Sequence, residues 1–594
     1  MQPKESPAHP PARPGPRAPS KSVSRRSFLG KVAATTLVAG VSADLAAHQG
    51  IDARSRSSSA RIDFLDLFRF PDSVTAYSEL TNPVRLTRHQ SEWHGDGIDV
   101  ESKVAAQELA INVRSSGMLV RYIHLRWDAS VSTRLQVLGD HWERSYGDLG
   151  WHNIIPERVM PWYFATHDGG TYHAYGVKTG AGSLCFWQLD PEGVSLWLNL
   201  SNGGSGVRLA QRILSAAVIV ARKGISGEDP THSLREFCRQ VCSQPTPAPQ
   251  VVYGTNDWYY AYGKNTAKQI LDDTDFIAGL SVENNVRPFS VIDMGWAAGA
   301  PAFPSMPDLA NKIRDRNVRP GIWIRPLEAP SDTDAALLMS AVRFGEKRER
   351  AKEFAYDPTI PEAQEKVIAK VKQVVAWGFD LVKHDFSTYD LLGRWGFEMG
   401  ADPTTPGWCF HDQSRTNAEI ILDLYRRIRE SCAKDRLILG CNTIGHLGQG
   451  YFDIQRTGDD TSGHVWERTR RMGVNTLAFR LPQHRAFFVQ DADCVGISAA
   501  VPWKANRQWL DLVAHSGTAL FISPGEGARV PEHAQAIRQA FQLVASGGDG
   551  ARPSSYLRES TPQTWITDGQ ASQHVPIELH YDWYMGAGAF PFAL

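Results

Sequence analysis

Hydrophobic and polar positions alternate with a period of two in the first third of the chain, from about residue 60 to 225. Runs of this kind include "GMLVRYIHLRW", "GSLCFWQL", "VSLWLNL" and "LSAAVIVAR", and Gly, Pro, Asn and Asp lie between them. Such alternation, broken by turn residues, is typical of antiparallel strands that bury one face. A segment of helical periodicity, "SLREFCRQVC", comes next. The pattern predicts an antiparallel β-sandwich domain over residues 60–243 that ends in a helix.

A proline-rich stretch, "SQPTPAPQ" at 243–250, separates this region from one with a different pattern. From 251 to about 548, apolar runs that suit buried strands alternate with amphipathic segments such as "PEAQEKVIAKVKQVVAWG". The strand candidates are "VVYGTND", "FSVIDMGW", "RPGIWIRP", "FDLVKHDF", "RLILGCNT", "YFDIQRTGDD", "AFFVQDAD" and "TALFISPG". Eight strands that alternate with helices in about 300 residues predict an α/β fold, a (β/α)8 TIM barrel over 251–548.

Polar residues collect at the carboxyl end of nearly every one of these strands. A doubly wound open sheet would show the same alternation of strands and helices, but barrel active sites are assembled at this end from several strands. A shared polar rim therefore favours the barrel. The rim candidates are Asn256, Asp257, Asp293, Arg325, Lys383, Asp385, Asn442, Arg456, Asp460 and Asp491.

The two ends of the chain differ from these domains. Residues 1–59 contain "KSVSRRSFLGK" and a mild apolar run, and Arg25 and Arg26 followed by Phe28 and Leu29 resemble a twin-arginine export signal. The resemblance implies passage through the twin-arginine export machinery to the periplasm or the cell exterior; the alternative is a chance Arg pair in a disordered tail. Residues 549–594 predict a short C-terminal β-like tail.

The amino-acid composition limits the classes of binding partner that are expected. Lys and Arg (63) nearly balance Asp and Glu (64), so no basic field for a nucleic acid is expected. No later stretch is apolar enough to span a membrane, so no membrane span is expected in the mature protein. The seven scattered cysteines form no CxxC pair, so no structural metal is expected. The sequence calls for no organic cofactor. Eighteen Trp and 17 Tyr suit a sugar ligand, although most aromatic residues belong to cores. A neutral oligosaccharide or glycoside is the expected partner, and the oligomeric state is left open.

Two carboxylates on one rim, Asp385 and Asp460, suggest glycoside hydrolysis, where one attacks and the other gives and takes a proton. Lys383 projects to the same face as Asp385, and its charge is expected to keep that carboxylate ionised. The neighbouring Asp459 is expected to raise the pKa of Asp460. The alternative is a structural role for each Asp, as a helix cap or a loop carboxylate. His384 faces the opposite side of the strand, which favours a packing role.

Several motifs in order resemble those of clan D glycoside hydrolases, most closely the family 36 α-galactosidases (melibiases). They run from about 251 to 545 and comprise "TNDWYYAYG", "VIDMGW", "FPSMPDLANKIRDRNVRPGIWIRPL", "DPTIPEAQEKV" through "WGFDLVKHDF", "QRTGDDT" and "QDADCVGI". The resemblance implies a retaining mechanism with Asp385 as nucleophile and Asp460, rather than Asp459, as acid/base. It also implies a set of substrate-binding residues, namely Lys383, Arg456, Asp293, Trp258, Trp323, Cys441 and Asn442.

The sequence departs from the family pattern at the sugar-binding positions. Met294 stands where the family has an Asp that holds galactose hydroxyls, and "CNTIGHLGQG" lacks the family's arginine. An N-acetylgalactosaminide, a β-L-arabinopyranoside or an α-glucan-derived substrate therefore remain alternatives to an α-galactoside. Transglycosylation and an inactive carbohydrate-binding protein are the other readings of the same residues.

Overall fold

The structure, a computed structural model, describes residues 64–210, 212–244, 251–346, 353–525, 527–569 and 576–586. The predicted export signal at 1–59 and most of the proline-rich boundary at 243–250 lie outside these residues. Within the described ranges, no helix is long and apolar enough to cross a membrane.

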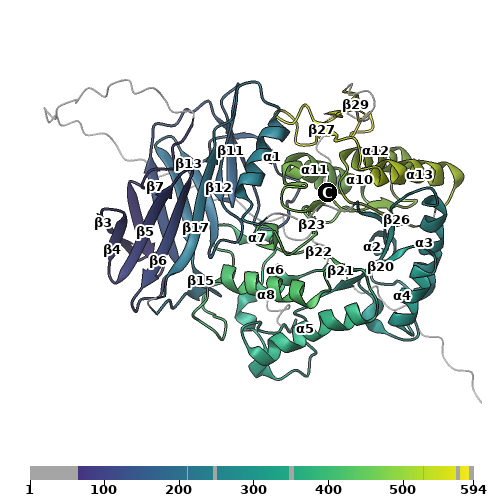
Figure 1. The fold of residues 1–594 in the computed structure, drawn as a ribbon, viewed down its shortest axis with the longest axis horizontal. Coiled ribbons are helices and arrows are strands. Elements are labelled where there is room, and N and C mark those ends of the chain that lie inside the picture. The colour runs from purple at the N-terminus through teal and green to yellow at the C-terminus, as the bar shows by residue number, and fades with distance from the viewer. Residues whose placement is uncertain are drawn as a thin grey trace, which may run out of the picture. The chain divides into compact units, whose positions relative to one another are not determined.

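Two antiparallel sheets make up the N-terminal region (Figure 1). In the described part of the chain, one sheet has six strands in the order β10 (Met160–Pro161), β13 (Leu184–Asp190), β14 (Gly193–Asn199), β7 (Tyr122–Asp128), β1 (Ser73–Tyr77) and β2 (Pro83–Arg85). The other has nine, in the order β3 (Thr87–His89), β4 (Glu92–Gly95), β5 (Ile98–Ala105), β6 (Glu108–Ser115), β17 (Leu214–Arg222), β12 (Tyr172–Val177), β11 (Tyr163–His167), β8 (Gln136–Gly139) and β9 (His152–Asn153). A small hairpin, β15 (Ser201–Asn202) and β16 (Ser205–Gly206), and helix α1 (Pro230–Val241) complete the region.

The two sheets share one apolar core, as the alternating pattern predicts. Trp127 and Trp187 of the six-stranded sheet are buried, and so is Phe164 of the nine-stranded sheet. The rings of Phe164 and Trp187 meet across the sheets with their centroids 5.6 Å apart. Because each strand turns its apolar residues inward and its polar residues outward, the two sheets bury one face each. The predicted antiparallel β-sandwich is confirmed.

A ring of parallel strands follows. Within the described residues it consists of β18 (Tyr253–Asn256), β19 (Phe289–Ile292), β20 (Arg319–Ile324), β21 (Leu381–His384), β22 (Leu437–Gly440), β23 (Ile454–Arg456), the interrupted pair β24 (Val489–Asp491) and β25 (Val495–Ile497), and β26 (Leu520–Pro524). β26 pairs with β18, and a parallel bridge between Asp491 and Ala519 joins β24 to the start of β26, which closes the ring. The predicted (β/α)8 barrel is confirmed; every strand except β25 lies inside a predicted run, because the seventh run ends at Asp493 and β25 begins at Val495.

Helices surround the ring (Figure 1). They are α2 (Trp258–Ala261), α3 (Ala267–Leu280), α4 (Met306–Arg314), α5 (Pro361–Ala376), α6 (Ser387–Leu392), α7 (Gly396–Met399), α8 (Asn417–Ser431), α10 (Trp466–Thr469), α11 (Asn475–Arg480), α12 (Trp503–Ser516) and α13 (Pro531–Ala545). α8 begins with a reciprocal capping box between Thr416 and Glu419, and α5 begins with a proline in its first turn. Inside the ring, Val291, Leu381 and Leu439 belong to an apolar cluster, so the interior is packed and polar chemistry is confined to the rim.

The fifth unit of the barrel lacks a full helix. Between β22 and β23 there is only α9 (Gly445–Gly448), and the β-sandwich packs at this place. The imidazole of His446 stacks on Trp162 with centroids 4.6 Å apart, and its Nε2 lies 2.8 Å from the carbonyl oxygen of Val177. Thr179 donates a hydrogen bond to Gln449 over 2.9 Å. The sandwich therefore takes the position that a fifth helix would occupy.

A small antiparallel sheet closes the described chain. It consists of β27 (Arg552–Pro553), β28 (Thr564–Ile566) and β29 (Glu578–His580). Trp565 and Trp583 are buried beneath it, and the indole of Trp466 in α10 donates to the carbonyl oxygen of Trp583 over 2.9 Å. The tail therefore packs on the barrel rather than forming a separate sandwich.

Gly254 offers a test of the strand packing. Its φ is +151°, and a Cβ at this position would lie 1.9 Å from the carbonyl oxygen of Phe289 in the neighbouring strand. We expect Gly254→Ala to lower the free energy of unfolding by about 2–4 kcal/mol, because the backbone must shift to admit the methyl group. Gly279, exposed near the end of α3 with no atom within 4 Å of an added Cβ, is the control. Gly279→Ala should leave stability unchanged or raise it by up to about 1 kcal/mol. Urea denaturation measures both, and equal effects would contradict the assignment of close packing to Gly254.

Candidate active site

Asp385 and Asp460 lie on the same rim of the barrel. Asp385 directly follows β21, and Asp460 comes four residues after the end of β23. Both are partly exposed, in contrast to most of the charged residues around them. Strand ends in a barrel converge on this face, so segments far apart in sequence meet here.

The carboxylate of Asp385 is held by three N–H donors. The indole Nε1 of Trp323 donates to Oδ2 over 2.9 Å. The backbone N–H groups of Phe386 and Asn442 donate to Oδ1 over 2.7 and 3.0 Å. Phe386 has a left-handed conformation with φ of 68°, which turns the chain sharply after the strand. Donors fixed in this way stabilise a negative charge and orient the carboxylate.

Lys383 forms an ion pair with Asp293. Its ammonium group lies 2.6 Å from Oδ2 of Asp293, and the side-chain amide of Asn256 donates to the same oxygen over 2.8 Å. Burial alone would lower the pKa of Lys383, but the Asp293 carboxylate, together with Cys441 and Cys494, holds the pKa well above its usual range. From the sequence, Lys383 is expected to keep Asp385 ionised through its charge; in the structure its ammonium group forms an ion pair with Asp293, and N–H donors hold Asp385.

Asp460 lies among guanidinium groups. Oδ1 is 3.0 Å from Nη2 of Arg456 and 3.4 Å from Nη1 of Arg144, while 42% of the side chain is exposed. Burial favours the protonated form, but the positive charges of Arg456, Arg144 and Arg468 outweigh it and lower the pKa of Asp460 to about 2. The expected rise in the pKa of Asp460 is wrong. The sequence places Asp459 and Arg456 near Asp460, but it does not show that the charge of Arg456 acts on Asp460 or that Arg144 reaches it from the other domain.

Asp459 and Asp493 complete the charge arrangement. Asp459 is buried and accepts from Nη2 of Arg468 over 2.7 Å. Asp493, at the break between β24 and β25, lies 2.6 Å from Nη2 of Arg456 and accepts from the hydroxyl of Tyr259. Arg456 therefore bridges Asp460 and Asp493, which fixes the angle at which Asp460 enters the rim.

The aromatic and thiol candidates occupy different places. Trp258 opens α2 and is half-buried at the rim, with its ring 5.5 Å from that of Tyr262. Trp323 is buried, and its contribution is the hydrogen bond to Asp385 rather than an open face. Cys441 is buried with Sγ 4.0 Å from Nη1 of Arg456, and burial, reinforced by Asp385, holds the pKa of its thiol well above the usual range. The thiol is therefore protonated and unsuited to nucleophilic attack.

The side chains of Asn442 and His384 both contact other residues of the protein rather than the rim opening. The side-chain oxygen of Asn442 accepts from the N–H of Tyr389 over 3.1 Å, and its amide donates to Glu143. His384 packs against Tyr425 and Phe452, with ring centroids 5.7 and 5.4 Å away, and burial lowers its pKa to about 3. His384 is thus neutral and turned away from the rim.

Glu143 and Arg144 are site residues that the sequence did not reveal. Both belong to the β-sandwich domain, on the segment between β8 and β9, and both are buried at the rim of the barrel. Arg144 contacts Asp460, and Glu143 accepts from the side chain of Asn442. In the sequence they form part of "DHWERSYGD", a charged loop in a predicted sandwich, which gives no signal of contact with a distant barrel.

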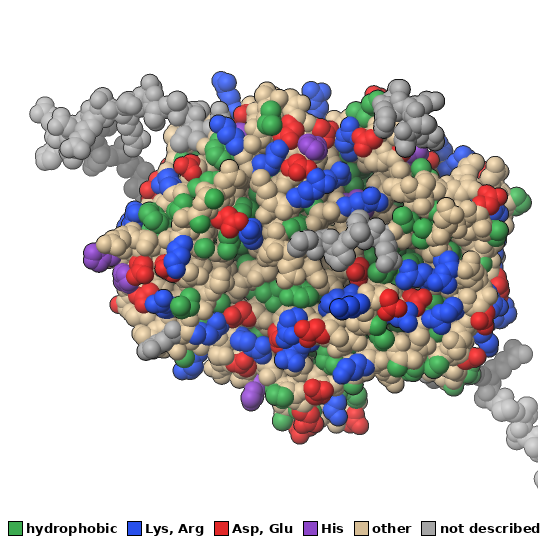
Figure 2. All heavy atoms as spheres, viewed as in Figure 1, with side chains coloured by type: hydrophobic (Ala, Val, Ile, Leu, Met, Phe, Trp, Pro, Cys, Tyr) green, Lys and Arg blue, Asp and Glu red, His purple; other side chains and the backbone are tan. Residues whose placement is uncertain are grey.

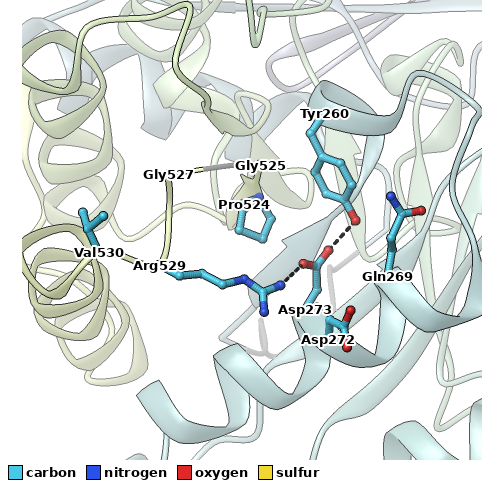
Figure 3. A pocket seen from close by; sticks show the side chains of 9 residues that line it. All are labelled: Tyr260, Gln269, Asp272, Asp273, Pro524, Gly525, Gly527, Arg529 and Val530. Carbon is cyan, nitrogen blue, oxygen red and sulfur yellow. Dashed lines mark hydrogen bonds and ion pairs between the residues drawn. The ribbon is translucent and has the colours of Figure 1, made fainter.

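A separate pocket lies beside the rim (Figure 3). It has a volume of about 520 Å³ and lies between α3 and the residues that follow β26. The hydroxyl of Tyr260 and the guanidinium of Arg529 both point to Asp273, over 2.6 and 2.9 Å. Tyr260, Arg529 and Asp273 are thus paired with one another within the pocket. In the described residues, no group of three or more His, Cys, Asp or Glu side chains is arranged to hold a metal.

The fold is that of known α-galactosidases. No protein-family model matches the chain, and no curated protein sequence is similar to it. Among solved structures, the α-galactosidase TtGalA of Thermus thermophilus, in complex with p-nitrophenyl α-D-galactopyranoside, matches with 15% identity and a TM-score of 0.53 over 86% of this chain and 99% of that chain. The α-galactosidase of Lactobacillus brevis matches with 12% identity and a TM-score of 0.55 over 84% and 75%. The family 36 α-galactosidase AgaA of Geobacillus stearothermophilus, in complex with 1-deoxygalactonojirimycin, matches with 11% identity and a TM-score of 0.51 over 84% and 76%. The predicted resemblance to glycoside hydrolase family 36 is confirmed at the level of the fold.

Asp257 gives a pH-dependent prediction. Burial, reinforced by the Asp293 carboxylate, raises the pKa of Asp257 to about 7. An unfolded Asp titrates near 3.9, so the folded state binds the extra proton and the free energy of unfolding falls as pH rises from about 4 to 7. Asp257→Asn removes this titration, and its amide can donate to Oδ1 of Asn265, which accepts no hydrogen bond, once the Asn265 amide turns over.

We expect the fall in unfolding free energy between pH 5 and pH 8 to be smaller in Asp257→Asn than in the parent by on the order of 1–3 kcal/mol. Urea denaturation at the two pH values measures it. Asp435→Asn, at a side chain that is 72% exposed, should keep the full fall. Identical pH dependence in Asp257→Asn and the parent would show that Asp257 does not titrate as described.

Proposed function

We propose that the protein is a retaining, exo-acting glycoside hydrolase that removes terminal α-galactosyl or related residues from oligosaccharides. The observation that carries the proposal is the pair of rim carboxylates, Asp385 held by N–H donors and Asp460 held by guanidinium groups. Glycoside hydrolysis requires two carboxyl groups with different roles. The α-galactosidases that share the fold support the substrate class.

The reaction uses two displacements. Asp385 attacks the anomeric carbon while Asp460 gives its proton to the departing glycosidic oxygen, and a glycosyl ester of inverted configuration forms on Asp385. Asp460, now a carboxylate, takes a proton from a water molecule. The resulting hydroxide displaces Asp385 and restores the original configuration. This course requires carboxyl groups roughly 5 to 5.5 Å apart.

Substrate binding supplies the condition for proton transfer. In the free protein the arginines keep Asp460 ionised at neutral pH. A sugar that seals the exposed part of the Asp460 side chain excludes water, and loss of hydration raises the pKa of a carboxyl group. Asp460 is then protonated when the substrate binds, so it can act as the general acid only in the complex.

The surface favours a neutral substrate. On the face drawn in Figure 2, acidic and basic side chains are interspersed rather than gathered by sign. At the rim, the charged groups are largely paired with one another, Lys383 with Asp293 and Arg456 with Asp460 and Asp493. A neutral sugar leaves these pairs intact, whereas a charged ligand would compete with them.

Met294 favours a second candidate sugar. Its side chain is 37% exposed at the rim, and its N–H donates to Oδ1 of Asp293 over 2.8 Å. A thioether is a weak hydrogen-bond acceptor and cannot donate, so this position offers little to a sugar hydroxyl. A β-L-arabinopyranoside, which has the galactose ring pattern without the exocyclic hydroxymethyl group, needs less from it.

The central experiment is a panel of p-nitrophenyl α- and β-glycosides, including α-galactoside, α-N-acetylgalactosaminide and β-L-arabinopyranoside. We expect turnover of one or more of these sugars with retention, observed by nuclear magnetic resonance of the first anomer released. Asp385→Asn and Asp460→Asn should each lower kcat by about 10³-fold or more. Azide should rescue Asp385→Asn and give a glycosyl azide of inverted configuration.

Asp435→Asn is the matched control, because it changes an exposed carboxylate on the loop that precedes β22 and should keep parental kcat. Release of the inverted anomer first would exclude the two-displacement course. Sugar binding by calorimetry without turnover of any glycoside would favour an inactive binding protein, and transfer to an added sugar in preference to water would favour a transglycosylase.

Export by the twin-arginine pathway is part of the proposal, based on Arg25 and Arg26. We expect replacement of both by Lys to leave the protein in the cytoplasm, because this pathway reads the arginine pair. Cell fractionation with immunoblotting measures it, and a paired replacement of Arg54 and Arg56 by Lys is the control. Normal export of the Arg25, Arg26 variant would contradict the assignment.

A further inference from the structure

One segment of the β-sandwich lies against the rim of the barrel. Residues 140–149 make up most of the connection between β8 and β9, and Ser145 pairs with the loop that carries Asp459 and Asp460. The N–H of Ser145 donates to the carbonyl oxygen of Thr457 over 2.9 Å, and the N–H of Asp459 donates to the carbonyl oxygen of Ser145 over 2.8 Å. The segment therefore continues the barrel's own hydrogen bonding beyond β23.

The segment is fixed at both ends by buried polar side chains. The guanidinium of Arg480 donates to Oδ1 of Asp140 over 2.8 Å and to the carbonyl oxygen of Thr457 over 2.8 Å. At the other end, Asn475 accepts from the N–H of Leu149 over 3.2 Å and donates to its carbonyl oxygen over 2.7 Å. These bonds make the segment a rigid part of the rim, because buried hydrogen bonds are costly to break.

Arg144 acts on the candidate acid. It is buried, with Nη1 3.4 Å from Oδ1 of Asp460 and 3.5 Å from Oδ1 of Asp459. Its guanidinium lies over the ring of Trp395, 5.6 Å from the centroid. Because Arg456 approaches the same oxygen of Asp460 from within the barrel, the two guanidinium groups confine that oxygen from two domains.

Glu143, the preceding residue, acts on the candidate nucleophile through Asn442. The Glu143 carboxyl is fully buried, where it accepts from the N–H of Gly396 over 2.9 Å and from the side chain of Asn442. The backbone N–H of Asn442 donates to Oδ1 of Asp385 over 3.0 Å. A Cβ at Gly396 would lie 2.7 Å from Cγ of Glu143, so the fit is close on this side too.

We infer that Glu143 and Arg144 are positioning residues through which the β-sandwich orients the two aspartates of the barrel. Glu143 orients Asp385 through Asn442, and Arg144 orients Asp460 and stabilises its negative charge. The inference rests on the proposed function. Glu143 is shut off from the rim opening and contacts Asn442 rather than a substrate, so its effect is on geometry. Arg144 adds an electrostatic effect, because a guanidinium at this distance favours the ionised form of Asp460.

Arg144→Gln tests the charge. We expect kcat on the sugar found in the glycoside panel to fall about 10- to 100-fold with KM within about threefold, since orientation of the acid is lost rather than binding. The alkaline limb of the kcat profile, which reports loss of the acid's proton, should move up by about 0.5 to 1 pH unit, because removal of a positive charge raises the pKa of Asp460. Arg144→Lys keeps the charge and should keep the limb in place, with a partial loss of kcat.

Glu143→Gln tests the second contact. It should lower kcat and move the alkaline limb less than Arg144→Gln does, because Glu143 acts on Asp385 through Asn442 and is linked to Asp460 only through Arg144, whose Nε lies 3.8 Å from Oε1 of Glu143. Arg126→Gln is the matched control: Arg126 forms an ion pair with Asp190 inside the β-sandwich over 2.5 Å, away from the barrel. Arg126→Gln should affect stability and leave kcat and its pH profile unchanged. Parental kcat and an unmoved limb in Arg144→Gln would overturn the inference while the proposed function stands.

A stability measurement, which needs no catalytic activity, tests the contact of Arg144 with Asp460 separately from the proposed function. In a double-mutant cycle, Asp460→Asn should lower the urea midpoint of the Arg144 parent more than that of the R144Q variant at pH 7, and this difference should shrink as pH falls toward 2. A nonzero cycle in a protein that hydrolyses no glycoside would support the contact and refute the proposed function. Additive effects of the two substitutions would overturn the inference whatever the activity.

Discussion

The backbone pairing of Ser145 with the loop after β23 is the interaction on which the site depends. It brings Glu143 and Arg144 from one domain to the rim of the other. Two consecutive residues of a single segment then act on both aspartates, Arg144 by contact with Asp460 and Glu143 through Asn442 beside Asp385. A barrel alone supplies the strand ends and their carboxylates. The second domain adds Arg144 to the barrel's own Arg456 and Arg468 around Asp460, and its Glu143 holds the side chain of Asn442 beside Asp385.

The fold could be predicted from the sequence because its signals are local. Each barrel strand is an apolar run of a few residues, and Lys383 and Asp385 were placed on one face by the two-residue period of the strand. The positions of Asp293, Asp385 and Asp460 at strand ends follow from the same local pattern. Their partners do not, because Lys383 pairs with Asp293 across 90 positions of sequence.

The pKa of Asp460 depends on contacts that the local sequence does not contain. The neighbouring Asp459 argues for a raised pKa, but the guanidinium groups of Arg456, Arg144 and Arg468 lower it. One of these, Arg144, is separated from Asp460 by 316 positions and lies in another domain. Long-range charge contacts of this kind depend on how domains pack, and a loop such as "DHWERSYGD" carries no periodicity that would reveal its docking place.

The short α9 has a consequence for how the chain is made. A standard barrel covers each strand with its own helix, but here Trp162, from a domain that leaves the ribosome first, packs on His446 of the short α9 between β22 and β23. The sandwich can therefore fold early and present a finished surface to the barrel as synthesis proceeds. Sandwich and barrel then form one cooperative unit, and cutting the chain at the proline-rich boundary would leave each part with an uncovered face and a tendency to aggregate.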